Sequence, residues 1–291
     1  MARIAFSTVA CPDWTLDRVA QIALDAGYSG VELRSMGRGG TEFVCDPGLT
    51  APGKVRRLTI HKGVEVAGVA SGVHYDTPVF PPVIGHVFPH KFASIESTKE
   101  FVDIASEIGA PFVRVFPFGA RAKRGCKALR RLVVGRLVLA ADAARHSGVR
   151  LLLENGGAYP TAEEVASLVD EVGSPNLSVC YALAAAHEAG EDVAKGVRTL
   201  GGRLRMARVK DLRAGEPRPL GQGDQPCEDF VRAANAAAST QWIVFEWDKA
   251  WVPGLADASE ALPEAARTLI GWMRAANGHA STDDARAAVA V

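Results

Sequence analysis

The sequence has 291 residues, of which 48% are hydrophobic, so the chain can bury a large core. Lysine plus arginine and aspartate plus glutamate balance at 33 each, which leaves no net field to attract nucleic acid or an anionic membrane. No apolar run approaches the ~20 residues that span a bilayer, and the N-terminus lacks the basic-then-apolar pattern of a signal peptide.

Short apolar runs with strand character alternate along the chain with stretches of helical character. The first expected helix has a capping residue at Asp13 or Thr15, apolar residues at helical spacing, and Gly27 as its end. The expected strands are 3–8, 29–34, 64–70, 111–117, 149–154, 177–181, 203–209 and 242–247. The expected helices are 15–26, 50–62, 92–108, 127–147, 161–172, 191–200, 226–239 and 259–275.

Eight strand–helix units of roughly 36 residues predict an α/β fold, a single-domain (β/α)8 TIM barrel over residues 1–275. Two doubly wound sheets are the alternative, but no G-x-G-x-x-G motif opens a helix and no linker divides the chain. The aperiodic stretch 75–90 is rich in Pro, Phe and His, and we expect it to be a long loop on the catalytic face. Residues 276–291 are small and polar, which predicts a disordered tail.

Two of the most apolar runs end in a carboxylate. Glu154 closes Val-Arg-Leu-Leu-Leu-Glu (149–154), and Glu246 closes Trp-Ile-Val-Phe-Glu (242–246). Runs this apolar are typical of strands that are buried on both faces of a parallel sheet. A carboxylate at the end of such a strand has to be paired, bound to a metal or catalytic, because an isolated buried charge is costly. We therefore expect Glu154 and Glu246 at the catalytic end of the barrel.

Further residues stand near the ends of the expected strands and are candidates for binding a substrate. Along the seventh strand, alternation places Met206, Arg208 and Lys210 on one face. Each candidate also has a structural interpretation: charged residues as solvated or paired groups, the histidines as ordinary loop residues, and the tryptophans as packing beneath helices. The candidates besides Arg208 and Lys210 are Glu32, His74, Arg114, Trp14, Trp247 and His187.

Several short motifs together resemble one known family. They are Ala-Gly-Tyr-Ser-Gly-Val-Glu-Leu-Arg (26–34), Leu-Glu-Asn-Gly (153–156), Ala-Gly-Glu-Asp (189–192), Val-Lys-Asp (209–211), Leu-Gly-Gln-Gly-Asp (220–224) and Phe-Glu-Trp (245–247). Over residues 3–275 the sequence resembles the sugar phosphate isomerase/epimerase family of xylose-isomerase-like barrels. The resemblance implies an enzyme with a small-molecule substrate, but its motifs do not name that substrate.

The resemblance also implies a site for one divalent metal, held in the family by Glu, Asp, His and Glu from strands five to eight. Glu154 and Glu246 match the two glutamates. The Asp position, eight residues before the glycine of the Gly-Glu pair, is Ala182 in this chain. Ala185 stands three residues further on, where relatives often carry His or Asn. The His position, two residues before Lys-Asp, is Arg208.

Arg208 is expected to replace the metal, because a guanidinium stays protonated and has no free lone pair with which to ligate an ion. Two glutamates alone in a barrel mouth would repel each other, and one of them would take up a proton. A guanidinium between them keeps both ionised. We therefore expect no metal and no other cofactor; if a metal is bound, His187 and Asp211 are the ligands to test.

The leading hypothesis for function is a metal-independent isomerase or epimerase. It would transfer a proton next to a carbonyl of a small polyhydroxylated or carbonyl-bearing substrate. Glu154 and Glu246 would be acid and base, and Arg208 or Lys210 would stabilise the enolate oxygen. An alternative is a cyclase, lyase or hydrolase that acts on a natural-product intermediate in a biosynthetic pathway. A third is a non-catalytic barrel subunit.

Other classes of function are disfavoured. The abasic-site endonucleases of the same superfamily need a cluster of three metals, whereas this chain has seven histidines and carries Ala and Arg at the matching positions. We therefore expect no nucleic acid and no membrane as partners, and we leave a homo-oligomer open. The five scattered cysteines, without C-x-x-C spacing, favour reduced thiols in the cytoplasm.

Overall fold

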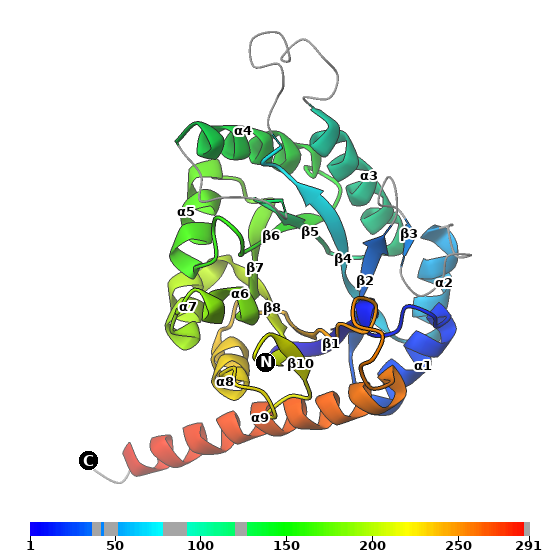
Figure 1. Cartoon of the computed structure of the whole chain (residues 1–291), viewed down its shortest axis with the longest axis vertical. Coiled ribbons are helices and arrows are strands. Elements are labelled where there is room, and N and C mark those ends of the chain that lie inside the picture. Colours follow the sequence, from blue (N-terminus) through cyan, green and yellow to red (C-terminus); the bar gives the residue numbers. More distant parts are fainter. Residues whose placement is uncertain (37–41, 44–51, 78–91, 120–126, 288–291) are drawn as a thin grey trace.

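The computed structural model describes residues 1–36, 42–43, 52–77, 92–119 and 127–287. Side chains are described in these ranges except at 36, 42–43 and 276–287. Within this part of the chain, eight parallel strands form a closed barrel surrounded by helices, as Figure 1 shows. The predicted single TIM barrel is therefore confirmed. Of the loop expected at 75–90, only residues up to 77 belong to the described part.

The strands follow one another around the barrel in chain order, and the first strand closes the ring by pairing with both the second and the last. Each begins and ends within a few residues of the predicted range, apart from the third, which runs on to His74. The barrel strands are β1 (Arg3–Ser7), β2 (Gly30–Met36), β4 (Glu65–His74), β5 (Phe112–Phe116), β6 (Arg150–Glu154), β7 (Leu177–Ala182), β8 (Leu204–Val209) and β11 (Trp242–Phe245).

The helices around the barrel begin where local chemistry favours a start. Thr15 accepts a hydrogen bond from the backbone of Arg18, and Thr161 forms a capping box with Glu164. Gly27 adopts the left-handed conformation that ends the first helix. The helices are α1 (Leu16–Ala26), α2 (Pro52–Lys62), α3 (Ala93–Ile108), α4 (Lys127–Ala143), α5 (Ala162–Val172), α6 (Leu183–Glu188), α7 (Val193–Leu200), α8 (Cys227–Ala236) and α9 (Ala258–Ala287).

Four small features differ from the sequence prediction. Helix α6 follows β7 directly, and two short antiparallel elements, β3 (Glu42–Phe43) against β2 and β9 (Asp211–Arg213) against β10 (Glu216–Arg218), were not expected. Helix α9 continues to Ala287, beyond its predicted end at 275. The expected disordered tail, 276–291, is thus helical in the structure as far as Ala287, and residues 288–291 lie outside the described part.

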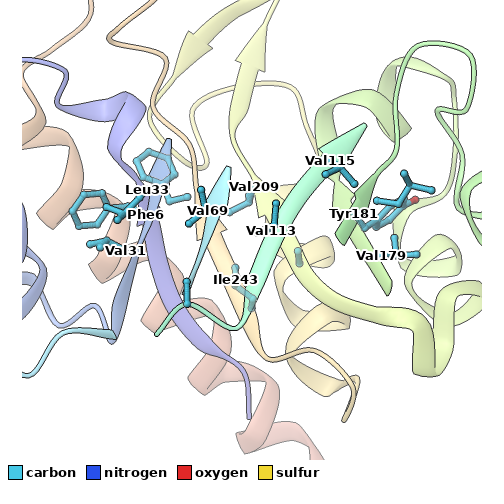
Figure 2. Packing of buried hydrophobic residues seen from close by; sticks show 14 of the residues in the cluster. Phe6, Val31, Leu33, Val69, Val113, Val115, Val179, Tyr181, Val209 and Ile243 are labelled. Atoms are coloured by element: carbon cyan, nitrogen blue, oxygen red, sulfur yellow. The ribbon is translucent and has the colours of Figure 1, made fainter. Parts of the chain in front are cut away.

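The strand residues that point away from the barrel axis pack against the helices and form the main hydrophobic core. Figure 2 shows part of this outer layer, with Phe6 from β1, Val69 from β4 and Ile243 from β11 among its members. The alternation that places these residues outside sends their neighbours inside.

No helix in the described part is long and apolar enough to cross a membrane.

The interior of the barrel is filled by its own small cluster, which forms a floor beneath the mouth. Its largest member, Trp242, is fully buried, and the guanidinium of Arg3 lies 4.1 Å from its ring centre. Gly30 makes room for that ring, because a Cβ at this position would lie 2.8 Å from Cη2 of Trp242. The cluster comprises Ala5, Ala67, Phe112, Leu152, Cys180, Met206, Trp242 and Val244.

Candidate functional site

Charged side chains occupy the barrel mouth above the apolar floor. Alternation along each strand brings them there: Arg208 lies two residues beyond the interior residue Met206, and Glu154 lies two beyond Leu152. Glu246 directly follows the end of β11 and lies two residues beyond the interior residue Val244. Carboxyl ends of barrel strands form the catalytic face in this architecture.

Arg208 is the centre of this group and is 5% exposed. Its Nη1 donates to Oε2 of Glu32 at 2.6 Å, and its Nε lies 3.3 Å from Oε2 of Glu154. Its Nη2 is in contact with Oε2 of Glu246. All three nitrogens of the guanidinium therefore face a carboxylate, and the two glutamates that end the apolar strands are joined through one cation.

A second arginine, Arg114, joins the same carboxylates from the other side. Its Nε donates to Oε1 of Glu32 at 3.2 Å, and its Nη1 donates to Oε2 of Glu154 at 2.5 Å. Burial of Glu32 raises its pKa, but the neighbouring charges of Arg208 and Arg114 outweigh that effect and lower the pKa to about 2. Burial alone would lower the pKa of Arg114, but the charges of Glu154 and Glu32 outweigh burial and raise that pKa. Glu32 is thus a buried anion that holds two arginines.

The accessible side of the site is formed by Lys210. Its ammonium donates to Oε1 of Glu246 at 3.0 Å and to Oδ2 of Asp248 at 2.9 Å. Lys210 is 26% exposed, compared with 5% for Arg208, so it is the cation of this group that is open to a ligand. Both oxygens of Glu246 are then paired, one with Lys210 and one with Arg208.

Glu154 has one crowded oxygen and one open oxygen. Its Oε2 accepts from Arg114, lies close to Arg208, and is 3.7 Å from Sγ of Cys180. Burial and the adjacent Glu154 raise the pKa of the Cys180 thiol well above its usual range, which keeps the thiol protonated. Within the described part of the chain, Oε1 of Glu154 accepts no hydrogen bond. Glu154 lines the cavity of the mouth, and Oε1 is the oxygen that retains the capacity to accept a hydrogen bond from a ligand.

The mouth contains a cavity of about 250 Å³. That volume is slightly below the ~300–1,000 Å³ typical of ligand pockets, so the cavity suits a small metabolite. Charged residues make up one part of its lining, and small, amide or aromatic residues make up the rest. The lining residues are Phe118, Glu154, Asn155, Gly156, Gly157, Ala182, Ala184, Ala185, Arg208, Val209, Lys210 and Glu246.

Asn155 ties the ends of two neighbouring strands together. Its Nδ2 donates to the carbonyls of Pro160 and Ala182, and its Oδ1 accepts from the backbone N–H of Ala182 at 2.6 Å. The side chain is buried and its polar atoms are occupied by the protein itself. Asn155 therefore fixes the position of Ala182 and is not placed to bind a ligand.

The residues at the mouth do not fit the divalent metal that the resemblance implies. Position 182 is an alanine without a donor atom, and Oε2 of both Glu154 and Glu246 faces Arg208. A guanidinium supplies no lone pair to an ion. In the described residues, no group of three or more His, Cys, Asp and Glu side chains is arranged to hold a metal.

The two substitute ligands lie elsewhere. His187 is exposed in the last turn of α6 and is not part of the cavity lining. Asp211 is buried, and its carboxylate accepts backbone hydrogen bonds from Gly221, Gly223 and Gln225. Asp211 thereby organises the loop after β10, which leaves its oxygens little capacity for an ion.

The structure brings six of the predicted site residues into one network of ion pairs: Glu32, Arg114, Glu154, Arg208, Lys210 and Glu246. Glu32 and Arg114, predicted to bind substrate, are almost fully buried and contact the other charges instead. These contacts follow from charge balance, because each buried ion needs partners before a ligand arrives.

Four other candidates lie outside that network. Trp14 and Trp247 belong to the outer hydrophobic layer, where Trp247 donates its indole N–H to the carbonyl of Ala256 at 3.0 Å. Trp247 faces outward because it directly follows the inward-facing Glu246. His74 pairs with Asp76 at 2.7 Å, and His187 is exposed. None of these four side chains is among the lining residues of the cavity, and their part in substrate binding stays a prediction.

Some residues of the site had no place in the sequence prediction. Asp248 stands two residues after Glu246 and so shares its phase, which could have indicated it as a partner for Lys210. Phe118 follows β5 in a loop, where no periodicity signals a direction. Arg34 lies two residues beyond Glu32, and burial together with the charge of Arg114 lowers its pKa to about 10. Its Nη1 donates to the carbonyl of Ser71 at 3.1 Å.

Comparison with solved structures finds the same fold in proteins of low sequence identity. An L-ribulose 3-epimerase has a TM-score of 0.77 and 18% identity, with coverage of 97% of this chain and 98% of that one. The IolI protein with a bound zinc atom has a TM-score of 0.76 and 16% identity, with 93% and 98% covered. The probable 3-DHS dehydratase AsbF from Bacillus anthracis has a TM-score of 0.72 and 15% identity, with 92% and 98% covered.

Comparison by sequence alone is more restricted. No curated protein matches the chain. A family model described as "xylose isomerase-like TIM barrel" matches residues 20–276, which is most of the sequence. The match spans the strands and helices that carry the charged mouth. The chain therefore belongs to the xylose isomerase-like TIM barrel family.

Proposed function

We propose that the protein is a metal-independent enzyme that transfers a proton next to the carbonyl of a small substrate, in an isomerase or epimerase reaction. The observation that carries this proposal is the state of Glu154. One of its oxygens is held by two arginines, the other accepts no hydrogen bond from the described residues, and the side chain lines the cavity. An ionised carboxylate with one open oxygen at a substrate cavity is equipped to act as a base.

In the proposed reaction, Oε1 of Glu154 takes a proton from the carbon beside the carbonyl. The electron pair of the broken C–H bond moves into the new C–C double bond, and the carbonyl oxygen becomes an enolate oxygen. Lys210 supplies positive charge at that oxygen, because its ammonium is the most accessible cation of the site. On a substrate with a hydroxyl beside the carbonyl, protonation of the former carbonyl carbon, together with transfer of the hydroxyl proton to the enolate oxygen, gives the isomerised product. Protonation of the original carbon from the other face gives the epimer.

Glu246 serves the opposite side of the substrate. Its two oxygens are bound by Lys210 and Arg208, which favour its ionised form. A proton that reaches the enolate from this side therefore comes from the Lys210–Glu246 pair, with Lys210 as its source. Arg208 touches both glutamates and offsets their mutual repulsion, which is the part of a metal's work that a guanidinium can perform.

The test is proton exchange in deuterated water. We would incubate the protein with D-fructose, dihydroxyacetone and 2-hydroxycyclohexanone in excess EDTA, and follow the C–H signals next to each carbonyl by NMR. At least one compound should lose its C–H signal at an undiminished rate in EDTA. Glu154→Gln should lower that rate about 100-fold or more, because general base catalysis contributes ~10²–10⁴-fold. Glu188→Gln, an exposed position on α6, is the matched control.

Two results would reject the proposal in different ways. Exchange that stops in EDTA and returns with added Mn²⁺ would show that a metal is required. Exchange that is unchanged in Glu154→Gln, with the variant folded, would show that another residue is the base. Metal analysis of the purified protein should accompany the rates, with well under one ion per chain expected.

A second candidate function is elimination, which shares the first step. If the enolate carries a leaving hydroxyl on the next carbon, loss of water follows proton removal and the protein is a lyase. The partly apolar lining of the cavity favours this candidate over a reaction on a fully hydroxylated sugar. Product analysis separates the two, because only elimination changes the mass of the substrate.

Two buried cysteines, Cys180 and Cys227, carry thiols that form no disulfide, which supports the expectation of reduced thiols. We propose the cytoplasm as the compartment on that basis. A fractionation experiment in the source cell would decide it, because a protein recovered outside the cytoplasmic fraction would contradict the proposal.

A further inference from the structure

The cavity at the mouth is lined by two unlike sets of residues. The charged set comprises Glu154, Arg208, Lys210 and Glu246. Besides Asn155, the remaining lining residues are called the apolar wall, and they are Phe118, Gly156, Gly157, Ala182, Ala184, Ala185 and Val209. A ligand that fills this cavity therefore meets charged side chains from the first set and apolar side chains or backbone from the second.

Among the described residues, Phe118 is the one aromatic side chain of that wall, and it is seated in a way that only glycines allow. A Cβ on Gly156 would lie 2.6 Å from Cζ of Phe118, and a Cβ on Gly157 would lie 2.5 Å from its Cδ2. On another side, the ring of Phe116 meets it edge-on, with centroids 5.6 Å apart and an angle of 72° between the planes. The ring is therefore held in place by the loop after β6 and by β5.

Two of the polar groups at the apolar wall are already used. The side chain of Asn155 is bonded to the backbone of Ala182 and Pro160. The N–H and carbonyl of Gly156 exchange hydrogen bonds with the backbone of Tyr159, at 2.9 and 2.8 Å. A substrate hydroxyl directed at either of these residues would lose its water without gaining a partner, which is unfavourable.

We propose that Phe118 is a specificity-determining residue, and that the substrate is a small flat unsaturated ring with its carbonyl or enol oxygens along one edge. The flat face lies against Phe118 and the oxygens face Lys210 and Glu154. This inference rests on the proposed function and deepens it, because it selects a cyclic enolisable carbonyl compound over an open-chain sugar with hydroxyls on every carbon.

Binding of two matched probes tests the inference without any turnover. Resorcinol is a flat ring with two hydroxyls in a 1,3 arrangement, and cis-1,3-cyclohexanediol has the same hydroxyl pattern on a puckered saturated ring. Titration followed by protein NMR should give a Kd for resorcinol about fivefold lower than for the diol, as expected for one aromatic pair. In Phe118→Leu the two Kd values should agree within about twofold, and in Phe118→Tyr the preference should remain.

Trp251→Leu is the matched control, because Trp251 is 53% exposed and does not line the cavity. It should leave the preference unchanged. Circular dichroism confirms folding of each variant; if Phe118→Leu does not fold, Phe118→Met takes its place in the same comparison. Equal binding of the two probes by the wild type, no binding of either, or an unchanged preference without the ring at 118 would each overturn the inference.

The outcome is separable from that of the proposed function. Selective binding of resorcinol with no proton exchange on any carbonyl compound would support the role of Phe118 and reject the proposed reaction. Exchange on D-fructose without a preference for resorcinol would support the proposed reaction and reject the role of Phe118.

Discussion

Glu32 is the innermost charge of the mouth, and its two oxygens hold Arg114 and Arg208 in place. Its side chain is 1% exposed. A buried carboxylate with two guanidinium partners is stable only while those partners remain, and the partners in turn depend on it. Glu32 therefore positions the two arginines that contact Glu154, although it does not reach the cavity itself.

Replacing Glu32 by glutamine should lower the free energy of unfolding by about 3 kcal/mol at pH 7, given its pKa of about 2 against an ordinary value of 4.5. The folded-state pKa is below the ordinary value, so this stabilisation is complete above pH 4.5 and is lost as the pH falls towards 2. Urea unfolding of wild type and Glu32→Gln between pH 7 and pH 3 should show the difference shrinking on acidification. The exposed Glu100→Gln should show none. A pH-independent difference would contradict the assigned pKa.

Strand alternation was sufficient to predict that Glu154, Arg208 and Glu246 meet, because side chains two apart on a strand share a face. It could not reveal which partner each charge takes. Glu32 was expected to face the substrate, yet it faces two arginines from β5 and β8, which are distant in the sequence. Such pairings depend on side-chain reach across the barrel, which no local pattern encodes.

At the level of elements, the floor of the barrel depends on a fit between β2 and β11. Gly30 faces the buried ring of Trp242, and β1 lies between the two strands, where it pairs with both. A side chain on Gly30 would meet the carbonyl of Glu65 as well as the indole. Neither neighbour can move freely, because one is strand backbone and the other is a fully buried ring.

Gly30→Ala should therefore destabilise the protein by about 1–3 kcal/mol, the usual effect of overpacking. A Cβ there would lie 2.7 Å from the Glu65 carbonyl oxygen. Gly72→Ala, also on a barrel strand, is the control, since a Cβ added there would meet no heavy atom of the described residues within 4 Å. Calorimetric melting should place Gly30→Ala well below the wild type and Gly72→Ala close to it. Equal melting temperatures for the two variants would show that the barrel floor can accommodate a methyl group at position 30 without overpacking.

Long periodic elements were predictable because burial of one face imposes a period on the sequence. Short ones were not. The six residues of α6 contain good helix formers, but a single isolated turn and a half has no stability of its own. The hairpin β9–β10 is held by Asp211, whose carboxylate bonds to amides ten and more residues away. These features arise from tertiary contacts.

At the scale of the whole molecule, α9 completes the ring of helices beside α1 and α8. Its described side-chain contacts come from residues 258–275, because side chains beyond 275 are not described. The hydroxyl of Tyr28 donates to the carbonyl of Leu262 at 2.9 Å, and the side chain of Asn235 donates to the carbonyl of Met273 at 3.5 Å. The alternation of eight units was enough to predict this closed architecture, but the end of α9 carried no breaker that marked it.

A chain shortened to residues 1–276 should keep the melting temperature of the full chain within about 2 °C. The reason is that the buried face of α9, from Ala258 to Leu269, is retained. Differential scanning calorimetry of the two proteins under the same conditions checks this. A decrease of more than about 5 °C would mean that residues 277–291 pack against the barrel and that the domain extends beyond 275.

Asn155 has a consequence for how the protein meets a ligand. Its amide fixes Ala182, at the end of β7, to the neighbouring strand end. The ends of β6 and β7 are therefore locked by a bond within the protein, before any ligand is present. A preorganised opening of this kind loses little conformational entropy when a ligand binds. Little of the interaction free energy is therefore needed to order the protein, and more of it contributes to the affinity for the ligand.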